Sequence, residues 1–328
     1  MEDAMKAAVK TDDWLEVRDD VARPRPKSNE VLVKVHAATL NRADLFLAEG
    51  RAHGAHGGAG TLLGLEFAGE IVERGADVQG YGVGDRVMCS GIGGLAEYAV
   101  CDWRRIFPAP AGLDMAEASG LTVALRTAFV SLLDLGGLTP GQSVLVLGAS
   151  SGVGLMCLQM AKELGAGLVI GTSTTEARRA RLAEFGADLA LDGRAPDWAA
   201  QVTDATGGTG VDLAIDFLAG PYFDDLMRAT RIGGAVVNVG RMAGERGEVD
   251  FDLHSLRRIR YLGQTFRTRS AEEMGEIGAR LRTRFWSALD AGRLRLPVDR
   301  RLPLDRAAEA FDLMRANGHF GKIAVTPA

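Results

Sequence analysis

Two patterns of apolar and polar residues divide this chain. Up to about residue 115, apolar and polar residues alternate in short segments, such as residues 30–36, 64–75 and 84–90, and glycine and proline separate them closely. This pattern predicts antiparallel β-strands. After residue 115 the apolar residues take helical spacing, and strands then alternate with helices. A β-rich part is therefore followed by an α/β part.

Short apolar strands alternate with helices through the middle of the chain. A strand at 143–149 precedes a helix over 153–164, and further strands are expected at 167–173, 211–219, 235–241 and 259–266. This alternation predicts right-handed βαβ crossovers and a doubly wound parallel sheet of the Rossmann type.

The end of the chain no longer alternates short strands with helices. Helices are expected near 271–291 and 305–316, and a last strand follows in the segment that begins at residue 321. We therefore expect the α/β block to be inserted between two pieces of another domain.

The sequence GASSGVG at residues 148–154 stands where the first strand of this block turns into a helix. Backbone N–H groups and the helix dipole favour a phosphate at such a turn, and small residues let it approach. Gly152 and Gly154 open the helix, although Ala149 and Ser151 replace the first two glycines of the standard GxGxxG pattern. The alternative is a tight turn without a ligand, but the surrounding βα units favour a dinucleotide site.

The next strand of the block indicates which dinucleotide is bound. NAD sites usually carry an acidic residue about 20 residues after the turn, which binds the ribose hydroxyls. Here the strand ends in Thr172, Ser173 and Thr174, and Arg178 and Arg179 follow. A hydroxyl and a guanidinium bind a 2′-phosphate that a carboxylate would repel, so these residues favour NADPH. The alternative is that the arginines form a solvated helix face.

Composition limits the remaining classes. The chain has 328 residues with a formal net charge of −5, and its arginines are scattered, so no nucleic-acid partner is expected. Its apolar runs are short and its start is acidic, so we expect no membrane partner and no signal peptide, and a cytoplasmic protein. Cys89, Cys101 and Cys157 are interpreted as packing residues.

With these features in hand, the chain resembles the medium-chain dehydrogenase/reductase superfamily, and within it the zinc-independent zeta-crystallin-like NADPH:quinone oxidoreductases. The resemblance spans essentially the whole chain. The motifs that carry it are NRADLFLAEG (41–50), LLGLEFAGEIVERG (62–75), GGLAEYAV (93–100), GASSGVG, TFRTRS (265–270) and NGHFGKIAV (317–325).

The resemblance implies a fold and an assembly. Residues 1–122 would form a partly open, GroES-like β-barrel catalytic domain, and residues 123–266 an NADPH-binding Rossmann domain. Residues 267–328 would complete the catalytic domain. The active site would lie in the cleft against the nucleotide domain, and the family usually forms homodimers.

The resemblance also implies site residues, position by position. Asn41 is the candidate catalytic residue. The substrate pocket would be lined by Phe46, His53, Arg241 and Phe266. The cofactor-binding residues would be Asn41, Thr127, Ser151, Gly152, Val153, Ser173, Arg178, Val239, Gly240, Phe266 and Asn317. Two positions depart from the family. Gly193, followed by Arg194, stands near a common tyrosine, and Phe46 replaces another tyrosine.

No metal is expected. In the zinc alcohol dehydrogenases of the superfamily, ligands fall near positions 41 and 65, where this chain has Asn41 and Leu65. Glu66 remains, but one carboxylate makes no zinc site, and the four-cysteine structural lobe is missing. His53 and His56 are interpreted as solvated loop residues, and His36 as a packed strand residue.

An acceptor that takes hydride without a metal is a quinone or an α,β-unsaturated carbonyl, because the charge moves onto oxygen. Asn41 is the candidate donor of a hydrogen bond to that oxygen, and its alternative role is to fix the loop backbone or the nicotinamide carboxamide. Asp44 is expected to cap a helix. Two other functions stay open: an enoyl reductase for a polyketide-type intermediate, and a non-catalytic NADPH-binding protein.

Overall fold

The structure, a computed structural model, describes residues 4–52, 54 and 56–327. It divides into two compact units. Unit 1 comprises Met1–Val123 and Arg267–Ala328, and unit 2 comprises Ala124–Phe266.

Unit 1 is built mainly from antiparallel strands. Its strands are β1 (Ala4–Lys10), β2 (Leu15–Ala22), β3 (Glu30–Thr39), β4 (Glu66–Arg74), β5 (Arg86–Ser90), β6 (Tyr98–Asp102), β7 (Ile106–Pro108), β14 (Val298–Pro303) and β15 (Lys322–Thr326). Its helices are α1 (Arg42–Ala48), η1 (Trp103–Arg105), α2 (Met115–Ser119), α9 (Ala271–Asp290), η5 (Leu304–Arg306) and α10 (Ala307–Ala316). The main sheet has the order β14-β15-β3-β4-β5-β7, with β6 also paired to β3, and β1 pairs with β2.

The alternation that predicts β3 also decides which of its side chains are buried. Val33 and Val35 lie in the core of unit 1, whereas Lys34 and His36 are exposed. Successive side chains of a strand point to opposite faces of its sheet. The face that carries Lys34 and His36 is uncovered at these two positions, although Leu32 and Ala38 on the same face are buried. The prediction that His36 is packed is therefore wrong.

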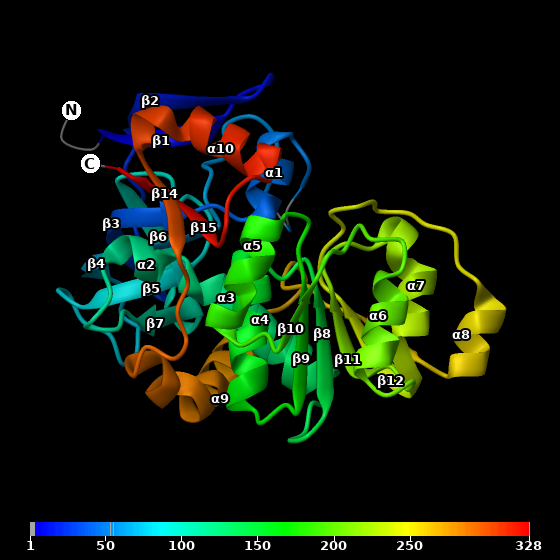
Figure 1. Cartoon of the computed structure of the whole chain (residues 1–328). Helices are drawn as coiled ribbons and strands as arrows, with labels where there is room; N and C mark the ends of the chain where they lie inside the picture. Colours follow the sequence, from blue (N-terminus) through cyan, green and yellow to red (C-terminus); the bar gives the residue numbers. More distant parts are fainter. Residues whose placement is uncertain (1–3, 53, 55, 328) are drawn as a thin grey trace. The chain divides into compact units, whose positions relative to one another are not determined.

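The C-terminal segment completes the sheet of unit 1. Strand β15 pairs with β3 in antiparallel register, with Ala324 opposite Thr39 and Val325 opposite Ala38. Figure 1 shows this last strand, in red, among the strands from the start of the chain. The two ends of the sequence therefore share one core, which includes Val33, Phe67 and Ile323.

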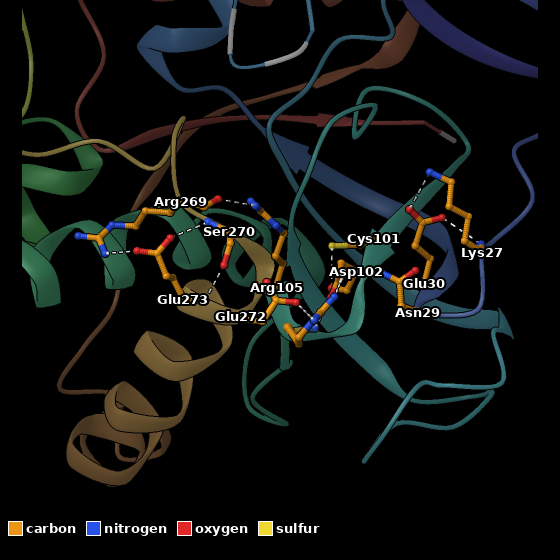
Figure 2. A network of polar contacts seen from close by, with 11 residues as sticks. Lys27, Asn29, Glu30, Cys101, Asp102, Arg105, Arg269, Ser270, Glu272 and Glu273 are labelled. Carbon is orange, nitrogen blue, oxygen red and sulfur yellow. Dashed lines mark hydrogen bonds and ion pairs between the residues drawn. The ribbon is translucent and has the colours of Figure 1, made fainter.

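A network of charged side chains fastens the start of α9 to the β6–η1 corner, as Figure 2 shows. The Arg104 guanidinium donates two hydrogen bonds to Asp102, at 2.9 and 2.6 Å, and also pairs with Glu272. The Arg105 guanidinium donates to the carbonyl of Arg269 at 3.4 Å. Ser270 caps α9 and begins its capping box. This network attaches the returning chain directly after the unit boundary at residue 267.

Unit 2 is an α/β layer structure. Its strands are β8 (Ser143–Leu147), β9 (Leu168–Thr172), β10 (Leu189–Leu191), β11 (Val211–Asp216), β12 (Thr230–Asn238) and β13 (Arg260–Gly263). Its helices are α3 (Leu121–Phe129), which begins at the unit boundary, η2 (Val130–Leu135), α4 (Gly152–Glu163), α5 (Glu176–Arg181), η3 (Leu182–Phe185), α6 (Trp198–Ala205), η4 (Gly220–Tyr222), α7 (Phe223–Ala229) and α8 (Phe251–Arg257). All strand pairs are parallel, in the order β10-β9-β8-β11-β12-β13.

The strand order reverses between β8 and β11. From β8 the chain proceeds outward to β9 and β10, then returns to β11 and proceeds the other way. This is the doubly wound Rossmann arrangement, and ligands of such sheets bind beside the carboxyl ends of the strands at the reversal. The predicted fold class is confirmed in both of its parts.

One helical segment is long and apolar enough to cross a membrane. It covers Met115–Leu135, and 78% of its most apolar window is buried within the protein. The segment contains α2, α3 (Leu121–Phe129) and the π-helical turn Val130–Leu135. A buried core helix has the same length and composition, so burial accounts for its apolar residues.

Candidate functional site

The turn between β8 and α4 presents backbone amides at the reversal point of the sheet. Ser151 is the N-cap of α4, and its hydroxyl accepts from the Gly154 amide at 3.1 Å. Within the described residues, the amides of Gly152 and Val153 have no hydrogen-bond partner. Two free amides at the start of a twelve-residue helix suit an anionic group.

Gly154 fits this turn because it has no side chain. A Cβ atom there would lie 2.7 Å from both Cα and O of Ala149, and 2.8 Å from its carbonyl carbon. The contact brings the first turn of α4 against the end of the preceding strand. The last glycine of the motif is therefore required by close packing of helix and turn.

The end of β9 lies against the same turn. Thr172 Oγ1 accepts from the Gly148 amide at 3.0 Å, and the Ser173 and Ser150 hydroxyls are 3.0 Å apart. The structure thus brings together Ser173 and the Ser151–Val153 turn, which are separated in the sequence. A bound nucleotide could contact both groups at once.

Positive charge gathers beside Ser173. Arg178 donates to the hydroxyls of Thr174 and Thr175, whereas Arg179 pairs with Asp192 at 2.8 Å. The pKa of Arg178 lies below its ordinary value, first because of burial and second because Arg194 is a positive neighbour. Two cations held close together favour an anion between them.

The turn after β12 holds three of the predicted residues. Asn238, at the end of β12, donates to the Asp216 carboxylate and to the Gly240 carbonyl, each at 3.0 Å. A Cβ atom at Gly240 would lie 2.4 Å from the Phe217 carbonyl oxygen, so only glycine fits. These contacts determine the conformation of residues 239–241 beside the end of β11. Asp216 and Asn238, which make them, were not predicted from the sequence.

Two further predicted residues of unit 2 lie outside these turns. Thr127 is buried in α3, and Phe266 is half-buried in the bend that follows β13. The predicted residues of unit 1 are Asn41, Phe46, His53 and Asn317, and His53 lies outside the described residues.

Asn41 lies in a buried polar cluster of unit 1. Its Nδ2 donates to Glu66 Oε1 at 2.9 Å, and its Oδ1 accepts from Lys322 Nζ at 2.8 Å. Lys322 also pairs with Glu66, and the two side chains are 3% and 0% exposed. From the sequence, Glu66 was interpreted only as an acidic residue beside a lost zinc-ligand position, and Lys322 was not predicted as a site residue.

The other predicted residues of unit 1 have structural contacts as well. Phe46, in α1, packs under Arg51, whose guanidinium carbon is 4.2 Å from the ring centroid. Asn317 ends α10 in a left-handed conformation with φ of 55°. Its side-chain oxygen accepts from Arg42 at 2.8 Å.

Asp44 completes the start of α1. Its Oδ2 accepts from the Asn41 amide at 2.7 Å, so the predicted capping role is confirmed. Burial raises the pKa of Asp44 to about 7, and the negative charge of Glu66 adds to that rise. The folded protein therefore holds this proton at a pH where the unfolded chain has lost it.

This raised pKa makes stability depend on pH. The contribution of protonated Asp44 is complete below the unfolded-state pKa of about 4 and is lost as the pH rises to about 7. We expect Asp44→Asn to flatten this fall in unfolding free energy, which amounts to at most about 4 kcal/mol. Chemical denaturation at several pH values measures it. The exposed Asp204→Asn is the control, and an unchanged slope in Asp44→Asn would contradict the assignment.

The described residues contain no cluster of three or more histidine, cysteine, aspartate or glutamate side chains that could hold a metal ion. The three cysteines are buried, as predicted for packing residues. At the two positions that correspond to zinc ligands, Asn41 binds Glu66 and Lys322, and Leu65 lies in the core.

The two units match two family models. Residues 27–111 match the alcohol dehydrogenase GroES-like domain, and residues 152–280 match the zinc-binding dehydrogenase model. The chain is 29% identical to the quinone oxidoreductase of Sus scrofa over 314 residues, which cover 94% of this chain and 92% of the relative. It is also 30% identical to the mycocerosic acid synthase-like polyketide synthase of Mycobacterium tuberculosis, over 98% of this chain but only 15% of that protein.

Two solved structures are also similar to this chain along nearly its whole length. An NAD-dependent alcohol dehydrogenase superposes with a TM-score of 0.88 at 29% identity, covering 99% of this chain and 100% of its own. A mycobacterial protein complexed with NADPH gives a TM-score of 0.87 at 26% identity, covering 98% and 100%.

The Rossmann unit, its glycine turn and the barrel unit together define an oxidoreductase of a nicotinamide-dependent family. The chain belongs to the medium-chain dehydrogenase/reductase superfamily, in its zeta-crystallin-like quinone oxidoreductase group.

Proposed function

We propose that this protein uses NADPH to reduce a quinone or an α,β-unsaturated carbonyl, without a metal. The main support for this proposal is that a turn suited to phosphate lies next to a cluster of hydroxyl and guanidinium groups. Ser173 contacts Ser150 of that turn, and Arg178 and Arg194 lie beside it. No carboxylate ends β9, where an NAD-specific site would have one.

The residues of unit 2 have separate tasks in this proposal. The amides of Gly152 and Val153 bind the pyrophosphate, and Ser173 and Arg178 bind the 2′-phosphate. Val239 and Gly240 would approach the nicotinamide from the end of β12. The bound cofactor supplies the hydride, and unit 1 supplies the group that faces the acceptor.

The donor atoms of unit 1 support a metal-free reaction. The position next to Glu66 is filled by the ammonium group of Lys322, and Leu65 offers no ligand. Zinc prefers cysteine, histidine and carboxylate ligands, whereas this site combines an amide, one carboxylate and a cation. The acceptor must therefore react with hydride without help from a metal, as quinones and enones do.

Asn41 is the candidate catalytic residue. As hydride adds at carbon, negative charge develops on the carbonyl oxygen of the acceptor, and a positioned N–H donor stabilises it. Solvent supplies the proton afterwards. The substrate-pocket residues implied by the family resemblance, namely Phe46, His53, Arg241 and Phe266, stay predictions.

A second candidate is an enoyl reductase that acts on a polyketide-type intermediate. The supporting observation is that 98% of this chain aligns with a segment of a polyketide synthase. Hydride addition to an enoyl thioester is the same chemistry as hydride addition to an enone.

Turnover tests the proposed function directly. Protein and NADPH are mixed with 9,10-phenanthrenequinone, with a panel of enones and with an enoyl thioester, and the absorbance at 340 nm is followed. We expect oxidation of NADPH by at least one quinone or enone. A preference for the thioester would favour the second candidate, and tight NADPH binding without any turnover would indicate a non-catalytic NADPH-binding protein.

The cofactor preference depends on Arg178. We expect NADPH to bind at least about tenfold more tightly than NADH, because one charge-assisted pair contributes about 1.5–3 kcal/mol. Arg178→Ala should remove most of this difference and leave NADH binding nearly unchanged. Arg181→Ala removes the same charge from α5, at a residue paired with Glu184, and should keep the preference. Calorimetric titrations of the three proteins with NADPH and NADH measure the six dissociation constants, and equal affinities in the wild type would refute the assignment.

We also propose that the protein forms a homodimer. The edge strand β13 has no partner on its outer side in the described residues, and Tyr261 on it is 38% exposed. Phe251 and Leu256 of the neighbouring helix α8 are 74% and 68% exposed. Apolar exposure beside a free strand edge favours association.

A further inference from the structure

The carboxamide of Asn41 lies between two opposite charges. Its oxygen accepts from the Lys322 ammonium at 2.8 Å, and its nitrogen donates to the Glu66 carboxylate at 2.9 Å. An ammonium group can only donate hydrogen bonds, and an ionised carboxylate can only accept them. A flipped amide would place its N–H donors against the Lys322 ammonium and its oxygen against the Glu66 carboxylate, so only one orientation is possible.

Glu66 is itself held rigidly. Besides Asn41 and Lys322, its carboxylate accepts from the hydroxyls of Thr39 and Thr122 at 2.8 and 3.1 Å, and from the amide of Val123 at 3.0 Å. Five donors therefore hold the Glu66 carboxylate in place, and this carboxylate in turn holds the carboxamide of Asn41. Such a buried ion pair contributes little net stability compared with apolar packing, which leaves room for a role in orientation.

The fixed amide has one donor to offer. Nδ2 carries two hydrogens, and one of them binds Glu66. The second has no acceptor among the described residues, and Asn41 is half-buried rather than enclosed. A ligand that meets this side chain must therefore present a hydrogen-bond acceptor, such as a carbonyl oxygen or an oxyanion.

We propose that Glu66 and Lys322 are positioning residues that act through Asn41. They lock its carboxamide so that it presents one N–H, and never its oxygen, to the carbonyl oxygen of the acceptor. This inference rests on the proposed reductase function. It also names the feature that the site selects in its substrate, an oxygen that gains negative charge during the reaction.

A double-mutant cycle tests the inference. Glu66→Gln keeps the shape but both donates and accepts, so it no longer dictates the orientation of Asn41. We expect Glu66→Gln and Asn41→Ala each to lower kcat about tenfold, with smaller changes in KM, and the double variant to be no slower than Asn41→Ala alone. Glu70→Gln makes the same chemical change at an exposed position of the same strand β4, outside the cluster, and should leave kcat unchanged.

Two outcomes would overturn the proposal. If the effects of Glu66→Gln and Asn41→Ala multiply in the double variant, Glu66 acts independently of Asn41. If Glu70→Gln lowers kcat as much as Glu66→Gln, the loss does not depend on the contact with Asn41. NADPH affinity and the melting temperature of each variant report whether it folds.

A measurement without turnover separates this inference from the proposed function. The sequence contains four asparagines, namely Asn29, Asn41, Asn238 and Asn317, so selective ¹⁵N labelling gives few side-chain signals. We expect one side-chain N–H signal of Asn41 to be shifted downfield and protected from exchange with solvent in the wild type, because it is bonded to the Glu66 carboxylate, and this shift and protection to be lost in Glu66→Gln. Random-coil shifts and no protection in the wild type would refute the fixed amide, whatever the acceptor. A fixed amide with no turnover of any acceptor would instead refute the reductase function.

Discussion

Glu66→Ala is expected to lower the free energy of unfolding by about 3–5 kcal/mol, the cost of breaking a buried ion pair from one side. The substitution leaves the ammonium of Lys322, which is 3% exposed, without its carboxylate. It also removes the acceptor of Thr39, Thr122 and the Val123 amide.

Chemical denaturation followed by circular dichroism measures this loss. The matched control is Glu70→Ala, which removes a carboxylate from an exposed position of the same strand β4. We expect the control to change stability by less than about 0.5 kcal/mol. Equal losses in the two variants would show that the buried cluster does not hold unit 1 together as described.

Gly154→Ala is expected to weaken NADPH binding about a hundredfold, because it displaces amides that each make a charge-assisted hydrogen bond of about 1.5–3 kcal/mol. The added Cβ would lie within 2.8 Å of three backbone atoms of Ala149. Backbone atoms cannot rotate away as a side chain can, so the turn itself must shift.

Fluorescence titration with NADPH measures the effect of Gly154→Ala. Gly263→Ala, on the edge strand of the same unit, is the control, because a Cβ there would meet no atom within 4 Å. We expect the control to bind NADPH like the wild type. Wild-type affinity in Gly154→Ala would mean that the turn is not the phosphate site.

Local patterns predicted most of the fold. The alternating segment at residues 30–36 and the apolar run before the glycine turn identified β3 and β8, because each depends only on neighbouring residues. The helix expected over 153–164 is α4, which begins one residue earlier at Gly152. His36 was misjudged because alternation alone does not tell which face of a strand is covered.

The candidate site was only partly predictable. Ser173 and the Ser151 turn belong to one βαβ unit, so their proximity follows from the fold. Glu66 and Lys322 lie 256 positions apart, and no local pattern links a strand near the start to the last strand of the chain. Their pairing becomes visible only once β15 is seen beside β3. The signal available in the sequence was the family motif that contains each residue.

We propose that the turn before α4 and the end of β9 together bind NADPH, and a crystal structure of the protein grown with NADPH shows whether they do. The pyrophosphate should accept from the amides of Gly152 and Val153, and the 2′-phosphate should contact Ser173 and Arg178. If the turn is empty, or if the 2′-phosphate lies in solvent away from Arg178, the protein does not bind NADPH as proposed.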